Sequence, residues 1–271
     1  MDNLFLSPLE MSRAISDIGE NKAKETMFEL FIYGILAGIY VAFGAAAATA
    51  VLSGGMLDPG LARFLSGTVF SVGLILVLIL GSELFTGNIL MTIGLIYQKY
   101  TFGKVLRNWL IVYFGNFLGA LIIAWLVSKS GLLVHGGDLT PIGSVAAKIT
   151  EAKLNLSFSE ALCRGILCNM LVCLAVILCI SSKTVGGKIL GIYFPIMAFV
   201  ASGYEHSVAN MYFLPAGLMA KGEFLSGFPG LFHNLIPVTI GNIIGGLLIV
   251  LLHPKVEERI ARRLVKTNNK H

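Results

Sequence analysis

The chain has 271 residues, of which 56% are hydrophobic and only 13% are charged. Soluble domains carry about 25% charged residues, so this composition excludes a soluble protein and indicates an integral membrane protein. The formal net charge of +5 does not require a nucleic-acid partner, because the basic residues cluster beside apolar segments and in the C-terminal tail.

The N-terminal segment, residues 1–26, has acidic residues early and an apolar run that is too short to be a secretory signal. We expect a short amphipathic helix at the membrane surface, and a disordered tail is the alternative. At the other end of the chain, residues 254–271 form a basic tail.

Six apolar runs follow one another along the chain, at residues 30–57, 64–98, 108–128, 165–182, 189–220 and 224–254. They carry no charge except for Glu83 in the second run and Glu205 in the fifth. As one helix, the 35 residues of the second run would reach roughly 50 Å, beyond a ~30 Å hydrocarbon core but short of two full spans. A span broken in the middle fits, because irregular backbone at membrane depth is tolerated where protein or a water-filled cavity surrounds it. We therefore predict an all-α membrane protein with six transmembrane helices, the second and fifth of them broken.

With six spans, both termini share one side of the membrane, and that side collects 14 of the 20 lysines and arginines. The positive-inside rule places this side in the cytoplasm. We expect a multi-pass protein of the bacterial inner (cell) membrane. Its predicted parts are an N-terminal cytoplasmic segment (1–26), a first three-helix repeat (27–128), an extracytoplasmic connection (129–158), a second three-helix repeat (159–253) and a basic cytoplasmic tail (254–271).

Three blocks of sequence occur twice, in the same order. ELFIYGILAG matches EALCRGILCN, ELFTGN matches EHSVAN, and NWLIVYFGNFLG matches NLIPVTIGNIIG; these blocks begin at Glu29, Glu160, Glu83, Glu205, Asn108 and Asn234. An odd number of spans in each half makes the second copy enter the bilayer from the opposite side, so the two broken helices should meet near mid-membrane. Many of the 31 glycines lie in small-residue runs, which predict closely packed helices.

Glu83 and Glu205 occupy matching positions at the two breaks. We expect them to hold the broken backbone in shape by accepting hydrogen bonds from free N–H groups, rather than to bind a substrate directly. His206 has Leu84 at the matching position of the first half, and its imidazole suits a small anion in either protonation state. The cysteines match no metal-binding spacing, so we expect packing roles, with no metal and no cofactor; they are Cys163, Cys168, Cys173 and Cys179.

Four segments, GSELFTGN (81–88), GILCNMLVCLAV (165–176), FVASGYEHSVANMY (199–212) and NLIPVTIGNIIGG (234–246), together closely resemble the formate/nitrite transporter family. The resemblance covers the chain from the first span to the sixth. It implies an aquaporin-like fold of three plus three helices, a homopentamer with one pore per subunit, and the passage of small monovalent anions. It implies a channel or transporter and not an enzyme.

The resemblance also assigns polar residues to the pore. Thr86 at the first break and His206 at the second would face the pore between two hydrophobic slits. Asn169 and Asn242 would position His206 or its proton, and Lys153 would be the basic residue of the outer vestibule. Because apolar slits impose a large desolvation cost on an anion, we expect His206 to lend a positive charge or a proton, so that transport is proton-linked.

Two apolar constrictions are implied on either side of His206. The cytoplasmic slit would consist of Leu74, Leu84 and Phe199. The outer slit would consist of Phe70, Phe85 and Val172.

Residues 86–88 bear on the choice of anion. They read Thr-Gly-Asn here, whereas the formate branch of the family carries a serine in place of the glycine, which favours hydrosulfide or nitrite over formate. The main alternative is an aquaporin-like channel for small neutral solutes, but the Asn-Pro-Ala motifs of such channels are missing. A membrane enzyme or receptor is the remaining alternative, and no nucleophile–base pair supports it.

Overall fold

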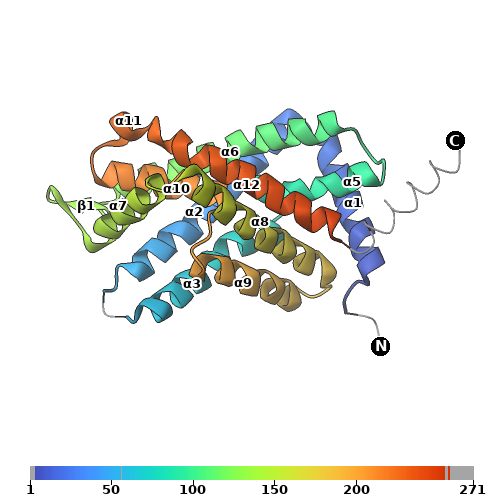
Figure 1. The fold of residues 1–271 in the computed structure, drawn as a ribbon, viewed down its shortest axis with the longest axis horizontal. Helices are drawn as coiled ribbons and strands as arrows, with labels where there is room; N and C mark the ends of the chain where they lie inside the picture. Colours follow the sequence, from blue (N-terminus) through green and yellow to red (C-terminus); the bar gives the residue numbers. More distant parts are fainter. Residues whose placement is uncertain (1–3, 56, 254–255, 257–271) are drawn as a thin grey trace, which may run out of the picture.

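The computed structural model describes residues 4–55, 57–253 and 256, and the described chain is mostly helical (Figure 1). The first half contains α1 (Pro8–Lys24), α2 (Met27–Leu52), α3 (Pro59–Ile79), α4 (Phe85–Asn88), η1 (Ile89–Met91), α5 (Thr92–Ile96) and α6 (Phe102–Lys129). The second half contains β1 (Val134–His135), β2 (Asp138–Leu139), α7 (Pro141–Leu154), α8 (Phe158–Ser181), α9 (Val185–Ala201), α10 (Ser207–Ala220), α11 (Phe224–Gly227) and α12 (Gly230–Leu251).

Matching capping boxes begin α2 and α8. Thr26 and Glu29 exchange side-chain and backbone hydrogen bonds at the start of α2, and Ser157 and Glu160 do the same at the start of α8. Each box satisfies backbone N–H groups that the first helical turn leaves free. The two glutamates are the first residues of a repeated block, so the halves begin their long helices in the same way.

Several helices have the length and composition of membrane spans. Within the described residues, α2, α3, α6, α8 and α12 are long and apolar enough to cross a membrane, and Phe85–Ile96 and Val185–Ala201 form shorter apolar helices. The protein is therefore a multi-pass membrane protein. Helix α3 ends at Ile79 and α4 begins at Phe85, so an interruption lies inside the second apolar run, as the lone glutamate indicates. The fifth run has the same feature between α9 and α10.

Glycines bring two pairs of helices into close contact. A Cβ on Gly119 of α6 would collide with the carbonyl oxygen of Ile35 in α2, and a Cβ on Gly245 of α12 would collide with that of Ile166 in α8. Backbones approach this closely only where a side chain is absent. The small-residue runs of the sequence thus correspond to the α2/α6 and α8/α12 contacts.

The N-terminal segment is helical and is attached to the membrane helices at both ends. The Leu6 N–H donates to the Ser181 carbonyl over 2.8 Å, and Arg107 of α6 donates through Nη2 to the carbonyls of Ala23 and Glu25. Helix α1 lies at one end of the molecule and α7 at the other (Figure 1). The predicted basic tail, residues 254–271, lies outside the described residues except for Val256.

Candidate functional site

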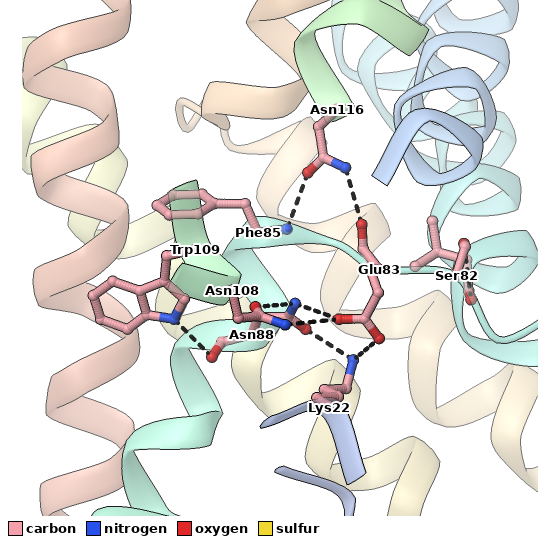
Figure 2. Close-up of polar contacts among 9 residues, drawn as sticks. Lys22, Ser82, Glu83, Phe85, Asn88, Asn108, Trp109 and Asn116 are labelled. Atoms are coloured by element: carbon pink, nitrogen blue, oxygen red, sulfur yellow. Dashed lines mark hydrogen bonds and ion pairs between the residues drawn. The ribbon is translucent and has the colours of Figure 1, made fainter. Parts of the chain in front are cut away.

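A buried polar network surrounds Glu83 at the first break (Figure 2). Lys22 of α1 donates to Glu83 Oε1 over 2.5 Å and to Asn88 Oδ1 over 2.9 Å. Asn88 Nδ2 donates to Glu83 Oε2 over 2.6 Å and to Asn108 Oδ1 over 2.8 Å. Glu83 is only 4% exposed, so the lysine compensates a charge that would otherwise be buried alone.

The second break carries a matching network around Glu205. Lys153 of α7 donates to Glu205 Oε1 over 2.8 Å, and Asn210 Nδ2 donates to Glu205 Oε2 over 2.6 Å and to Asn234 Oδ1 over 2.7 Å. The ammonium of Lys153 also lies 5.3 Å from the centre of the Phe213 ring, a favourable cation–π arrangement.

Lys22 belongs to the network around Glu83 and was not predicted from the sequence. The sequence marks it only as a topology signal, and its partner Glu83 is 61 residues away. The repeat contained the signal, because Lys22 precedes Glu29 by the same seven positions by which Lys153 precedes Glu160.

Two asparagines, rather than the glutamates, satisfy the free backbone at the breaks. Asn116 accepts from the Phe85 N–H over 3.0 Å and donates to the carbonyls of Gly34 and Glu83 over 2.7 and 2.9 Å. Asn242 likewise accepts from the Ser207 N–H and donates to the carbonyls of Gly165 and Glu205. The carboxylates were expected to accept from backbone N–H groups, but their partners are side-chain amides and lysines.

Thr86 and His206, one from each break, are in contact. Thr86 Oγ1 lies 2.9 Å from His206 Nε2, and the Ala209 N–H donates to His206 Nδ1 over 3.1 Å, which caps α10. Since a backbone N–H can only donate, Nδ1 is unprotonated, the ring proton lies on Nε2, and Nε2 donates to the threonine hydroxyl. The Phe199 ring stacks on the imidazole, with ring centres 5.9 Å apart.

Asn169 and Asn242 contact the surroundings of His206 and not its ring. Asn169 Nδ2 donates to the Thr86 carbonyl over 3.3 Å and to the Asn242 carbonyl over 2.7 Å. Asn242 bonds the backbone of the residues on either side of His206. Both therefore fix the position of the Thr86–His206 pair through the backbone.

A small apolar cavity, the central cavity, lies beside His206. Its volume is about 10 Å³, the space of roughly one water molecule. Its lining consists of Val41, Phe70, Leu74, Leu84, Val172, Ile196, Phe199 and His206. Two of these, Val41 and Ile196, were not predicted, because in an apolar helix a lining residue has the same composition as one that faces lipid.

Larger cavities adjoin the central cavity on two sides. The α1 cavity, of about 530 Å³, shares Leu74 and Leu84 with the central cavity and is lined by Lys22 and Glu83. The α7 cavity, of about 240 Å³, is lined by Lys153, Glu205 and His206. Each large cavity is thus lined by one of the two lysine–glutamate pairs.

Of the six expected slit residues, all but Phe85 line the central cavity, and four of them also line a larger cavity. Phe199 lies with Phe70 between the central and the α7 cavity, with ring centres 5.6 Å apart. Leu74 and Leu84 lie between the central and the α1 cavity. Phe85 is outside all three cavity linings and packs edge-on against Tyr113 at 4.9 Å.

A helical chain with several apolar spans, and with cavities on either side of a buried histidine, has the build of a membrane channel or transporter. Comparison with known proteins gives the family. The formate/nitrite transporter family model matches residues 9–255, so the chain belongs to this family, whose members are channels and transporters and not enzymes.

Named relatives cover nearly all of the chain. A protein of Methanothermobacter thermautotrophicus called "Probable formate transporter" is 41% identical, over 92% of this chain and 96% of its own length. The solved structure of an "FNT family ion channel" has a TM-score of 0.79 and 29% identity, covering 90% of this chain and 96% of its own. A "Pentameric formate channel with formate bound" has a TM-score of 0.69 and 32% identity, covering 83% and 94%.

Proposed function

We propose that this protein is a membrane channel or transporter for small monovalent anions and that formate is the first candidate. The names of the relatives support formate. Hydrosulfide and nitrite, which residues 86–88 favour, remain the second candidates. An aquaporin-like channel for neutral solutes is the alternative, and no observation favours it.

The proposed architecture is an inverted repeat with six crossings. The first repeat comprises α2, the broken helix α3 to α5, and α6; the second comprises α8, the broken helix α9 to α10, and α12. Support comes from the matching capping boxes, glycine contacts, asparagine bridges and lysine–glutamate pairs of the two halves. By the positive-inside argument, the side that carries α1 is cytoplasmic in a bacterial cell membrane.

The single observation that carries the proposal is the succession of three adjoining cavities, with His206 in the lining of the middle one and Thr86 in contact with the His206 ring from behind that lining. A path through the protein would run from the α1 cavity to the α7 cavity past these two side chains. The central cavity is too small for an anion, so Leu74, Leu84, Phe70 and Phe199 must move during transit. They would act as apolar constrictions that remove water from the anion.

In the proposed mechanism the two lysines attract the anion electrostatically, and Thr86 and His206 stabilise it at the centre of the path. Lys153 attracts the anion into the α7 cavity, and Lys22 does so on the other side. His206 lines the central cavity, and its Nε2 donates to Thr86, which is not part of that lining. Once the apolar side chains move apart, the Thr86 hydroxyl proton, which this bond leaves free, can be donated to an anion beside His206. A proton that travels with the anion along this pair would reduce the desolvation cost at the apolar constrictions.

Flux into liposomes tests the proposal. We expect liposomes that contain the purified protein to take up formate much faster than empty liposomes, and to remain impermeable to glycerol. His206→Leu, which copies Leu84 of the first half, should reduce formate uptake by at least tenfold, because the imidazole beside the central cavity and its hydrogen bond to Thr86 are lost. His233→Leu is the matched control, since His233 is exposed and lines none of the three cavities.

Two outcomes would overturn the proposal. Glycerol uptake without formate uptake would support the neutral-solute alternative. Equal formate uptake by the wild type and His206→Leu at every pH would remove the histidine from the mechanism. Repeating the measurement with hydrosulfide and nitrite would rank the three anions.

A further inference from the structure

The two large cavities differ in their balance of charge. The α7 cavity is lined by Arg63, Lys153 and Glu205, together with the neutral His206. Its fixed charges are therefore two positive and one negative. An anion that enters from this side meets a net positive lining.

The α1 cavity has a second carboxylate. Its charged lining residues are Lys22, Glu25, Glu83 and Lys188. Lys22 is paired with Glu83, whereas the described residues offer no ion-pair partner to Lys188. With both glutamates ionised the lining has no net charge, and with Glu25 neutral it has the same net positive charge as the α7 cavity.

Glu25 has no counterpart in the second half. It immediately precedes Thr26, the capping residue of α2, and the residue that precedes the capping Ser157 of α8 is Leu156. The extra carboxylate is therefore a specific feature of the α1 side. It is not needed to build the repeat.

The surroundings of Glu25 make its ionisation sensitive to pH near neutrality. Its Oε2 is buried without a hydrogen-bond partner among the described residues. Burial, assisted by the negative charges of Glu83 and Glu29, raises the pKa of the Glu25 carboxyl to about 7 against the opposing effect of Lys22 and Arg107. These groups belong to α1, the break, α2 and α6, and Lys188 of α9 faces the same cavity.

We propose that Glu25 sets the affinity of the α1 cavity for anions: the ionised carboxyl keeps the affinity low, and the neutral carboxyl lets Lys188 attract anions. Entry from the α1 side then becomes easier as the solution on that side becomes more acidic. Entry from the α7 side lacks this control. The inference rests on the proposed function, in which anions pass through the α1 cavity.

The half-saturating formate concentration, measured in liposomes at low ionic strength between pH 6 and pH 8, tests this role. A unit charge about 10 Å away in a water-like medium changes local anion concentration about twofold. We expect the wild type at pH 8 to need about twice the formate concentration that Glu25→Gln needs, and the two proteins to agree at pH 6. Lys188→Gln should raise the half-saturating concentration at both pH values, and the differences should shrink in high salt.

Matched controls separate this effect from a general change of surface charge. Glu151→Gln removes an exposed carboxylate of α7, and Lys183→Gln removes an exposed lysine five positions before Lys188 in the sequence; neither residue lines any of the three cavities. Both controls should follow the wild-type pH profile. Glu25→Leu, which copies Leu156 of the second half, is the second variant should Glu25→Gln not assemble, and it should give the same flat profile.

The outcomes distinguish this inference from the proposed function. A wild type without formate flux would defeat the proposed function. A wild type that conducts formate with a pH profile parallel to those of Glu25→Gln and Glu25→Leu would overturn the inference alone. A gap that opens only as pH rises would support it.

Discussion

At the scale of single residues, the Lys22–Glu83 pair joins α1 to the break of the membrane-spanning segment. The Lys22 side chain is 20% exposed and the Glu83 side chain 5%. Removing the lysine would leave a buried carboxylate without its cation, a change that destabilises strongly. We expect Lys22→Met to lower the free energy of unfolding by about 3 kcal/mol, the low end for a buried pair because the lysine is partly solvated. A lower thermal unfolding midpoint in detergent would show this.

The chain supplies a control two positions away. Lys24 forms an ion pair with Glu20 at 2.8 Å, but its side chain is 69% exposed. Exposed pairs of this kind contribute about 0.5 kcal/mol or less, so Lys24→Met should unfold at nearly the wild-type temperature. Equal shifts for the two variants would show that the buried pair has no special role.

The sequence predicted the residues at the breaks better than it predicted their partners. Glu83, Glu205 and His206 stood out because charge and imidazole are rare inside apolar runs. Some of their hydrogen-bond partners come from distant positions, as Lys22 does for Glu83 and Thr86 for His206, and such pairings depend on how helices pack. Lys22 could have been found from the repeat alone, since its spacing from Glu29 repeats that of Lys153 from Glu160.

At the scale of elements, the contact of α2 with α6 depends on Gly119. A Cβ there would meet the Ile35 carbonyl, which belongs to a helix backbone and cannot move aside alone. We expect Gly119→Ala to destabilise the protein by about 3 kcal/mol, the upper range for overpacking, with a lower unfolding midpoint in detergent. Gly245→Ala should act similarly on the α8/α12 contact.

The control for this prediction is Gly186→Ala at the start of α9. A Cβ there has open space around it, and alanine favours helix over glycine by roughly 1 kcal/mol. This variant should be as stable as the wild type or slightly more stable. Should Gly119→Ala be equally harmless, the two helices would not be held by backbone contact.

The helices themselves were largely predictable, because apolar length and a single charge in a run indicate spans and breaks. The apolar runs 30–57 and 108–128 correspond to α2 and α6, and the interruption at Glu83 is present. Packing order was less predictable. Phe199 was expected with Leu74 and Leu84; it lines the central cavity with them, and its ring also lies against Phe70. The direction of an aromatic side chain depends on helix rotation, which the sequence does not show.

At the scale of the whole molecule, exposed apolar side chains such as Leu110, Phe114 and Trp125 cover α6. In a membrane such a face contacts either lipid or another subunit, and both are equally apolar. The pentameric relative favours subunits for part of this surface. We therefore expect native mass spectrometry of the detergent-solubilised protein to give five times the mass of one chain.

The proposed path runs through cavities that a single chain forms by itself, so we expect each subunit of the expected pentamer to conduct independently. Co-assembly of wild-type and His206→Leu chains in varied ratios tests this. Formate flux should fall in proportion to the fraction of variant chains, because one closed subunit leaves its neighbours intact. A much steeper fall, in which a single variant chain silences the assembly, would place the path between subunits instead of within each one.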